Sequence, residues 1–320
     1  MKEWAIDKQD AGQRVDRYLG RKLPTVSESL RQKYIRLKRI RVNGKPAKKD
    51  TRLEEADVIS VYLNDACFEE AEARPDPLLS TFRPHIEIVY EDENILIVNK
   101  RPGLVVHPDA LEQVNTLITH VQAYMYQKGE FAPREEGAFV PALVNRIDRF
   151  TGGLVIAAKN EAALKELNRR MVAREVMKGY LCVTHGHWKV REGILTHYLT
   201  KTPGKKKVYV SDRPGPEAQQ AVTRFRVEAE KDGLALVFCE LVTGRTHQIR
   251  AQFAHVGHAL LGDNQYGNPD DERMYGRGYQ ALWATYLGFA FETDAGVLNG
   301  LNGKVFEVEA PFVQEYFPEA

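Results

Sequence analysis

The run from Leu143 to Ile156 constrains this chain most strongly. It reads Leu-Val-Asn-Arg-Ile-Asp-Arg-Phe-Thr-Gly-Gly-Leu-Val-Ile, so Asp148 stands between two arginines directly before a Gly-Gly turn. Two glycines let the backbone turn sharply and leave room for a substrate to approach closely. The apolar residues 154–158 then predict a short buried strand. We therefore expect the rest of the chain to be organised around a charged turn at the entrance of this strand.

The two arginines define what Asp148 could do. Opposite charges close to a carboxylate favour its ionised form, so we expect Arg146 and Arg149 to keep Asp148 anionic at neutral pH. An ionised carboxylate suits a nucleophile or an electrostatic stabiliser, not a general acid. The alternative is a structural ion pair at a strand entrance, because a motif this short often matches by chance. The run alone leaves both interpretations open.

Length and composition set the class of protein. The 320 residues exceed one ordinary domain, so we expect one large and one small domain. The formal net charge is only +1, so any affinity for nucleic acid must come from local patches. Cys67, Cys182 and Cys239 are far apart and unlike any metal-binding spacing, which indicates a reduced, cytosolic setting.

The sequence shows neither a leader nor a membrane span. Residues 1–7 lack the apolar core of a signal peptide, and no apolar run reaches the length that crosses a bilayer. We expect a cytoplasmic protein without membrane contact.

A basic segment dominates the N-terminal part. Ser27 is predicted to cap a helix whose Leu30 and Tyr34 share one face, and Asn43-Gly44 predicts a hairpin turn. Between residues 29 and 49 the chain has nine basic residues and no acidic one: Arg31, Lys33, Arg36, Lys38, Arg39, Arg41, Lys45, Lys48 and Lys49. Such a run can be an RNA-binding edge or simply a solvated helix face.

The order of these features resembles the S4-type RNA-binding domain. The resemblance rests on Gly12-x-Arg14-Val15-Asp16-x-x-Leu19, the basic second helix and Arg41-Val42-Asn43-Gly44-Lys45. It implies that residues 1–64 contact RNA phosphates, which position RNA without reading its sequence. The implied RNA-binding residues are Arg31, Lys33, Arg36, Lys38, Arg39 and Arg41. Residues 65–84 are acidic and contain prolines, so we expect a linker there and a catalytic domain over 85–320.

Further along, Asn160 is predicted to cap a helix from Glu161 to about residue 174, and Thr246 a second helix that ends at Gly257. The histidines at 185, 187, 247, 255 and 258 lack an accompanying cysteine or carboxylate cluster. A zinc site needs three convergent ligands, so we expect no metal.

The central run resembles the second motif of the RluA-like family of RNA pseudouridine synthases, usually His-Arg-Leu-Asp-Arg-x-Thr-Ser-Gly-Leu, in which the Asp is catalytic. Here Asn145 replaces the His and Gly152 replaces the Ser. Residues 100–108 resemble the family's first motif, and residues 241–267 resemble its third almost residue for residue. Residues 281–289 resemble a further block, with Trp283 where His is usual.

The resemblance implies an α+β domain built on a mixed, largely antiparallel sheet that isomerises uridine in RNA to pseudouridine. It implies that Asp148 is catalytic, that Tyr180 lies against the target base and that Arg250 reaches Asp148. Three further arginines would contact RNA: Arg245, together with Arg146 and Arg149, one of which fills the gap left by the flipped-out nucleotide. No cofactor is implied. The expected partner is RNA, with large-subunit ribosomal RNA preferred because an S4-type domain accompanies several members that modify it. We expect a monomer without an obligate protein partner.

Two other functions compete with this one. A non-catalytic RNA-binding or ribosome-assembly factor would not need Asp148, Tyr180 and Arg250, all of which are present. A nucleoside hydrolase would need metal-binding aspartates that the sequence does not show. Whether Asp148 adds to C6 of the base or attacks C1′ of the sugar stays open. The basic loop 201–207 either contacts phosphate or is solvated.

Overall fold

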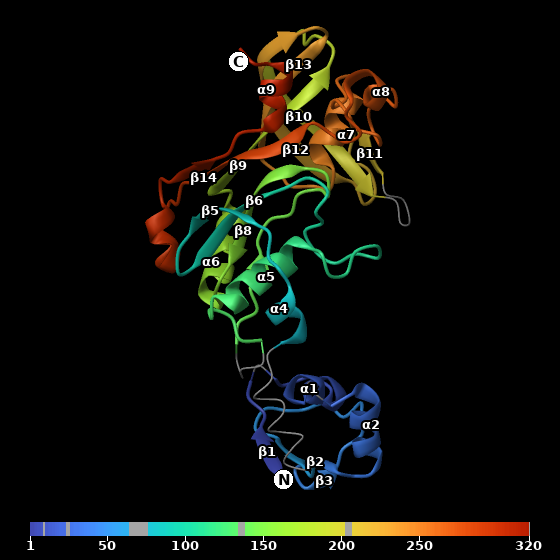
Figure 1. The fold of residues 1–320 in the computed structure, drawn as a ribbon, viewed down its shortest axis with the longest axis vertical. Helices are drawn as coiled ribbons and strands as arrows, with labels where there is room; N and C mark the ends of the chain where they lie inside the picture. The colour runs from blue at the N-terminus through green and yellow to red at the C-terminus, as the bar shows by residue number, and fades with distance from the viewer. Residues whose placement is uncertain (9, 24–25, 64–75, 134–137, 202–206, 320) are drawn as a thin grey trace. The chain divides into compact units, whose positions relative to one another are not determined.

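The computed structural model describes residues 1–8, 10–23, 26–63, 76–133, 138–201 and 207–319 (Figure 1). It divides the chain into two compact units. The smaller comprises Met1–Thr81 with Gly129–Ala138, and the larger comprises Phe82–Lys128 with Phe139–Ala320. Within the predicted linker 65–84, residues 65–75 lie outside the described residues and Pro77–Thr81 form a short helix, α4.

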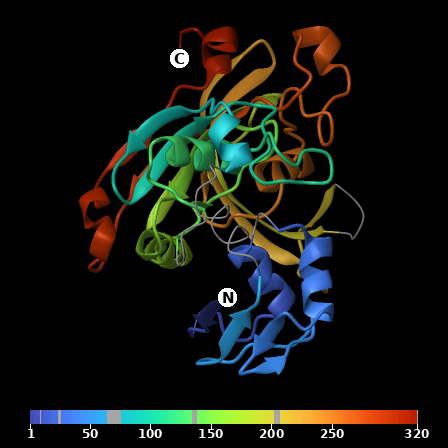
Figure 2. The same ribbon diagram turned by 60° about the horizontal axis from the view of Figure 1, so that its bottom comes forward.

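The smaller unit is a four-stranded antiparallel sheet with two helices. Its strand order is β1-β4-β2-β3, and Figure 2 shows both helices over one side of the strands. Its elements are β1 (Lys2–Ala5), α1 (Val15–Lys22), α2 (Glu28–Arg36), β2 (Ile40–Val42), β3 (Lys45–Pro46) and β4 (Val58–Val61). Ser27 caps α2, since its Oγ accepts from the Leu30 N–H at 3.4 Å. Asn43 and Gly44 both have positive φ, as the predicted hairpin turn requires.

The larger unit is built on one mixed sheet of eleven strands. The order is β11-β10-β12-β13-β9-β14-β8-β6-β5, with β15 beside β14 and β7 beside β8. Among the strands that the structure describes, only β14 and β8 pair in parallel, so the predicted mixed, mainly antiparallel α+β fold is confirmed. The strands are β5 (Glu87–Glu91), β6 (Ile95–Lys100), β7 (Ala142–Leu143), β8 (Gly152–Ala158), β9 (Val176–His185), β10 (Glu192–Lys201), β11 (Val208–Ser211), β12 (Gln219–Lys231), β13 (Leu234–Leu241), β14 (Leu282–Phe289) and β15 (Val305–Glu307).

Helices cover this sheet and supply its core. They are α5 (Leu117–Gln127), α6 (Glu161–Ala173), α7 (Gln248–His255), α8 (Asp271–Tyr275), the 3-10 helix η1 (Gly296–Leu301) and α9 (Pro311–Tyr316). Asn160 caps α6, since its Oδ1 accepts from the Ala163 N–H at 2.9 Å. Leu167 of α6 packs with Leu154 and Ile156 of β8 in one buried cluster. None of the described helices has the length and apolar character needed to span a bilayer.

The predicted cap of α7 is wrong. The N-cap is His247 in the left-handed conformation, φ 53°, and not Thr246. The Gln248 Oε1 instead accepts from the Arg245 N–H at 3.0 Å. A side chain inside the helix therefore provides the hydrogen-bond acceptor for a backbone N–H that precedes the helix. The end was predicted correctly, because Gly257 follows with φ 88°.

Candidate active site

Asp148 lies in a tight turn that leads into β8. The Thr151 N–H donates to the Asp148 carbonyl at 3.1 Å, which closes the turn. Asn145 anchors the segment before it: its Oδ1 accepts from the Ile156 N–H at 2.8 Å and its Nδ2 donates to the Leu154 carbonyl at 3.2 Å. The asparagine that replaces the family's usual histidine therefore binds the turn to the strand.

Arg250 is the cation that contacts Asp148. Its Nη1 donates to the Asp148 Oδ2 at 2.8 Å, while its Nε and Nη2 donate to the two oxygens of Asp263 at 2.7 and 2.9 Å. Asp263 is fully buried. Burial opposes ionisation, but the Arg250 guanidinium outweighs it and lowers the pKa of Asp263. Asp263 thus binds the Nε and Nη2 groups of the Arg250 guanidinium, and the Nη1 group is directed at Asp148.

The two arginines that flank Asp148 in sequence do not form its ion pairs, contrary to the sequence-based prediction. The Arg149 Nε donates to the Gly103 carbonyl at 3.0 Å, and its guanidinium lies 5.6 Å from the Phe150 ring centroid. Burial and the charge of Arg146 lower the pKa of His107. Among the described residues, Asp148 forms its ion pair with Arg250, and the His247 imidazole Nε2 lies 3.9 Å from the Asp148 Oδ2. Adjacent residues in a tight turn direct their side chains to different sides, so closeness in sequence did not place these charges together.

Tyr180 lies on β9 and is 6% exposed. Burial, and then the nearby charge of Asp148, raise the pKa of its phenol well above the usual value. Tyr180 is therefore a protonated ring beside the carboxylate at neutral pH.

Several groups around Asp148 were not given roles from the sequence. Lys100 is 1% exposed, and its Nζ donates to the carbonyls of Arg101, Leu104 and Arg149 at 3.0, 2.8 and 2.9 Å. Burial lowers the pKa of Lys100 to about 7, and the charge of Asp148 opposes this shift. Asp263, which fixes Arg250, was also given no role from the sequence, although it lies within the third motif, residues 241–267.

The third motif also supplies a second contact to the site. The His247 Nδ1 lies 3.0 Å from the Tyr266 hydroxyl, which in turn accepts from the Val208 N–H at 2.8 Å. Burial is the main cause that lowers the pKa of His247. His247 is therefore held as a largely neutral ring that ties α7 to the start of β11.

The predicted RNA-binding residues lie in both units. Arg245 is exposed, and its Nε donates to the Gln220 carbonyl at 3.2 Å. In the smaller unit, Arg31 donates to the carbonyls of Leu23 and Val26, so this side chain also holds α2 in place. The other five are exposed: Lys33, Arg36, Lys38, Arg39 and Arg41.

One cluster brings three possible metal ligands together at a distance from this site. His197 of β10, Asp212 and His255 of α7 place one ligand atom each within 4.8 Å of one another. The buried Gln252 Nε2 lies 3.2 Å from the His197 Nδ1, and the Gln252 oxygen already accepts from Thr223. An amide nitrogen cannot accept a proton, so the His197 Nδ1 keeps its lone pair and its Nε2 carries the hydrogen. This tautomer does not offer the Nε2 that faces Asp212 to a metal.

Comparisons with known proteins agree on the family. The sequence model of the family described as RNA pseudouridylate synthase matches residues 94–255. The chain is 31% identical over 315 residues to ribosomal large subunit pseudouridine synthase C of Escherichia coli K12, covering 96% of this chain and 92% of that protein. It is 29% identical to an uncharacterized RNA pseudouridine synthase of Bacillus subtilis, covering 96% and 93%.

A solved structure shows the same fold. Human RNA pseudouridylate synthase domain containing 1 superposes with a TM-score of 0.56 at 22% identity, covering 76% of this chain and 88% of that one. The matched residues 94–255 include Asp148, Tyr180 and Arg250. The family match defines an isomerase of uridine in RNA. The chain belongs to the RluA-like family of RNA pseudouridine synthases.

Proposed function

We propose that Asp148 is the catalytic carboxylate of this synthase and acts on a uridine flipped out of the RNA. The observation that carries the proposal is the contact between Asp148 and Arg250, whose guanidinium Asp263 fixes from behind. A carboxylate held by one N–H edge keeps a free oxygen for the substrate. Arg250 and Tyr180 complete the catalytic set.

The reaction exchanges one bond of the sugar for another. The N1–C1′ bond breaks, the base turns, a C5–C1′ bond forms, and the proton leaving C5 is balanced by the proton gained at N1. Asp148 can assist by adding to C6 of the uracil ring or by attacking C1′ as the glycosidic bond breaks. Arg250 counters its charge in either case.

Tyr180 serves as the platform on which the base stacks. Because its pKa is raised, the phenol holds its proton at neutral pH and cannot simply accept another one. Tyr180 can take the C5 proton only while it passes its own to an acceptor, and the Asp148 carboxylate supplies the nearby negative charge.

The substrate we propose is large-subunit ribosomal RNA, because the Escherichia coli relative is named for that RNA and aligns over 96% of this chain. The N-terminal unit would act as an S4-type domain whose exposed Lys33, Arg36, Lys38, Arg39 and Arg41 contact phosphates. Arg245, Arg146 and Arg149 would contact RNA near the site. A ribosomal RNA substrate would support a cytoplasmic location. The catalytic groups all come from one unit of one chain, which supports a monomer that needs no protein partner.

The test is Asp148→Asn, which removes the anion but keeps the shape. We expect tritium release from RNA containing 5-tritiated uridine, prepared from cells lacking the enzyme, to fall more than about 1000-fold, since a residue of a concerted catalytic unit costs at least that much. RNA affinity and thermal stability should change little. Asp232→Asn, an exposed turn position with φ 51°, is the matched control. Activity of Asp148→Asn within tenfold of wild type would refute the assignment.

A further inference from the structure

A cleft of about 200 Å³ opens beside the turn that carries Asp148. The residues that matter for its chemistry come from the larger unit: Phe150, Arg277, Tyr279, Gln280, Trp283 and Phe312. Phe150 is two positions beyond Asp148, so one wall of the cleft is part of the same turn. The proposed mechanism uses none of these side chains.

Two aromatic rings form the open wall. Phe150 and Tyr279 stack with centroids 5.9 Å apart and planes at 21°. They are 39% and 37% exposed, although large aromatic side chains are usually more deeply buried than this. Exposed aromatic rings are surfaces on which proteins stack unpaired bases of RNA.

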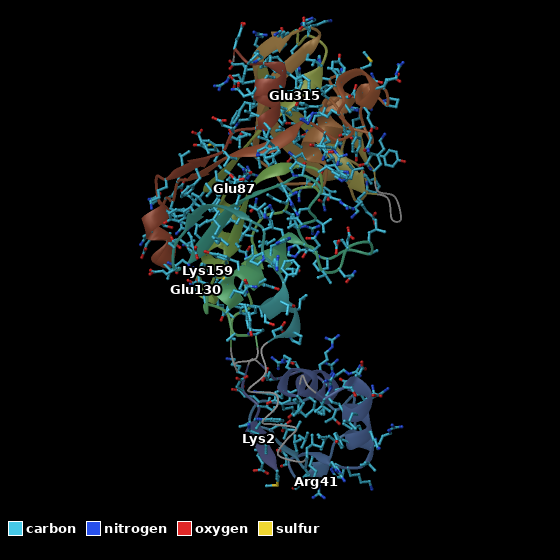
Figure 3. The ribbon with its side chains drawn as sticks, in the orientation of Figure 1. Lys2, Arg41, Glu87, Glu130, Lys159 and Glu315 are labelled. Atoms are coloured by element: carbon cyan, nitrogen blue, oxygen red, sulfur yellow. The ribbon has the colours of Figure 1, made fainter. Side chains whose placement is uncertain are left out.

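Arg277 supplies a positive charge next to these rings. Its guanidinium lies 5.3 Å from the Tyr279 centroid and 5.6 Å from that of Phe312. Its Nε is buried without a hydrogen-bond partner among the described residues. Its ion pair with Glu315 of α9, which Figure 3 labels, is long at 3.4 Å, and this carboxylate is half exposed. A phosphate that approaches the cleft would therefore find a cation that its present partner holds only weakly.

Gln280 adds a fixed polar group. It is 3% exposed, and its Nε2 donates to the Thr151 Oγ at 3.3 Å, so its amide is oriented from the Asp148 turn. An oriented amide can hydrogen-bond the edge of a base that stacks nearby.

The position of the cleft relates it to the catalytic site. Leu181 and Trp283 pack in the same cluster as Phe312, whereas Tyr180 precedes Leu181 on β9 and points to the other face of the sheet. The cleft and Tyr180 thus lie on opposite faces, and the turn 148–151 joins them at the edge. An RNA strand that leaves Asp148 across this turn reaches the cleft.

We propose that this cleft binds an unpaired nucleotide of the substrate RNA that is a near neighbour of the target uridine. Its base would stack on Phe150 and Tyr279, and its phosphate would meet Arg277. The volume is below the roughly 300–1,000 Å³ of pockets for drug-sized ligands, which suits a single planar base. The subsite rests on the proposed function, because it takes Asp148 as the place where the target is held. With this subsite, the enzyme would select RNA in which a nucleotide near the target uridine is unpaired.

The first experiment is Tyr279→Ser in the full chain. Losing one stacked base weakens binding by a factor of about 5 to 150. We therefore expect KM for RNA from cells lacking the enzyme to rise by that factor, with kcat within about twofold of wild type. Tyr279→Phe keeps the ring and should behave as wild type, and Met274→Ser removes an exposed apolar side chain from the same segment without lining the cleft. Unchanged KM for Tyr279→Ser would overturn the subsite, as would an equal rise for Met274→Ser.

The second experiment distinguishes a failure of the subsite from a failure of the catalytic role proposed for Asp148. RNA substituted with 4-thiouridine is cross-linked to wild type and to Asp148→Asn, and the cross-linked peptides are identified by mass spectrometry. We expect cross-links at Phe150 or Tyr279 in both proteins. Absence of both cross-links while Asp148→Asn is inactive would overturn the subsite alone. Full activity of Asp148→Asn with cross-links present would overturn the catalytic assignment alone.

Discussion

Lys100 links the buried interior of the larger unit to the turn that carries Asp148. Its ammonium group donates to three backbone carbonyls, one of which belongs to Arg149, the residue after Asp148. Burial disfavours the charge, while the three acceptors use all three protons of the ammonium. The side chain therefore fixes the backbone of the turn.

Lys100→Met should lower both stability and turnover. The apolar side chain fills the space but leaves the carbonyls without their donor, which costs about 2 kcal/mol or more of unfolding free energy. Turnover should fall as well, because the turn loses an anchor next to Asp148. Urea unfolding and tritium release measure the two effects, with the exposed Lys165→Met as control. A variant as stable and active as wild type would contradict this role.

At the scale of elements, Glu91 joins β5 to α5 and to the end of β8. Its carboxylate accepts from the Tyr124 hydroxyl at 2.8 Å and pairs with Lys128 and Lys159 at 2.7 and 2.8 Å. Burial opposes ionisation, but these three donors outweigh it and lower the pKa of Glu91 to about 2.

The pH dependence follows from the direction of that shift. The pKa in the folded protein is below the ordinary value of 4.5, so the stabilisation is complete above pH 4.5 and is lost as pH falls toward 2. Glu91→Gln should destabilise the protein by on the order of 1 kcal/mol at pH 7. This difference from wild type should shrink steadily below pH 4.5. Urea midpoints from pH 7 to 2.5 measure it, with exposed Glu319→Gln as control. A difference that stays constant with pH would contradict the pairing.

Local features of the fold were predictable because neighbouring residues determine them. The caps at Ser27 and Asn160 and the Asn43-Gly44 turn each need only a few consecutive residues. The α7 cap failed because Gln248, inside the helix, competes for the same backbone. Such competition depends on side-chain placement, which helix periodicity does not determine.

The electrostatics of the site were harder to predict. The family motif indicated that Arg250 reaches Asp148, and the structure places these two groups in contact. The flanking arginines were misjudged because distance along a turn says little about the distance between charged groups. Asp263 lies within the third motif, residues 241–267, but the motif alone did not indicate its role, because its contact with Arg250 forms only when the segment after α7 folds back.

For the molecule as a whole, a net charge of +1 conceals a strongly basic surface on the smaller unit. Replacing Lys33, Arg36 and Lys38 together by Gln in the full chain should weaken RNA binding. Each cation removed from a phosphate reduces the slope of log affinity against log salt by about 0.7 for single-stranded RNA, so the slope should fall by about 2. Turnover at saturating RNA should persist, because the groups that we propose for catalysis belong to the larger unit.

The control for this experiment replaces three exposed lysines of the larger unit: Lys165, Lys189 and Lys231. RNA affinity across a salt series is the measurement for both triple variants. Equal slopes for wild type and the N-terminal variant would show that the smaller unit does not bind RNA through these side chains.

The contact between Gly152 and Trp283 ties two positions of the chain together. A Cβ atom at position 152 would lie 2.4 Å from the indole ring, closer than real Cβ contacts, so a larger residue at 152 requires the indole to move. Both positions differ from the usual family motif, in which they are Ser and His. Serine at 152 and tryptophan at 283 exclude each other in this arrangement, so the residue at one position limits what the other can be.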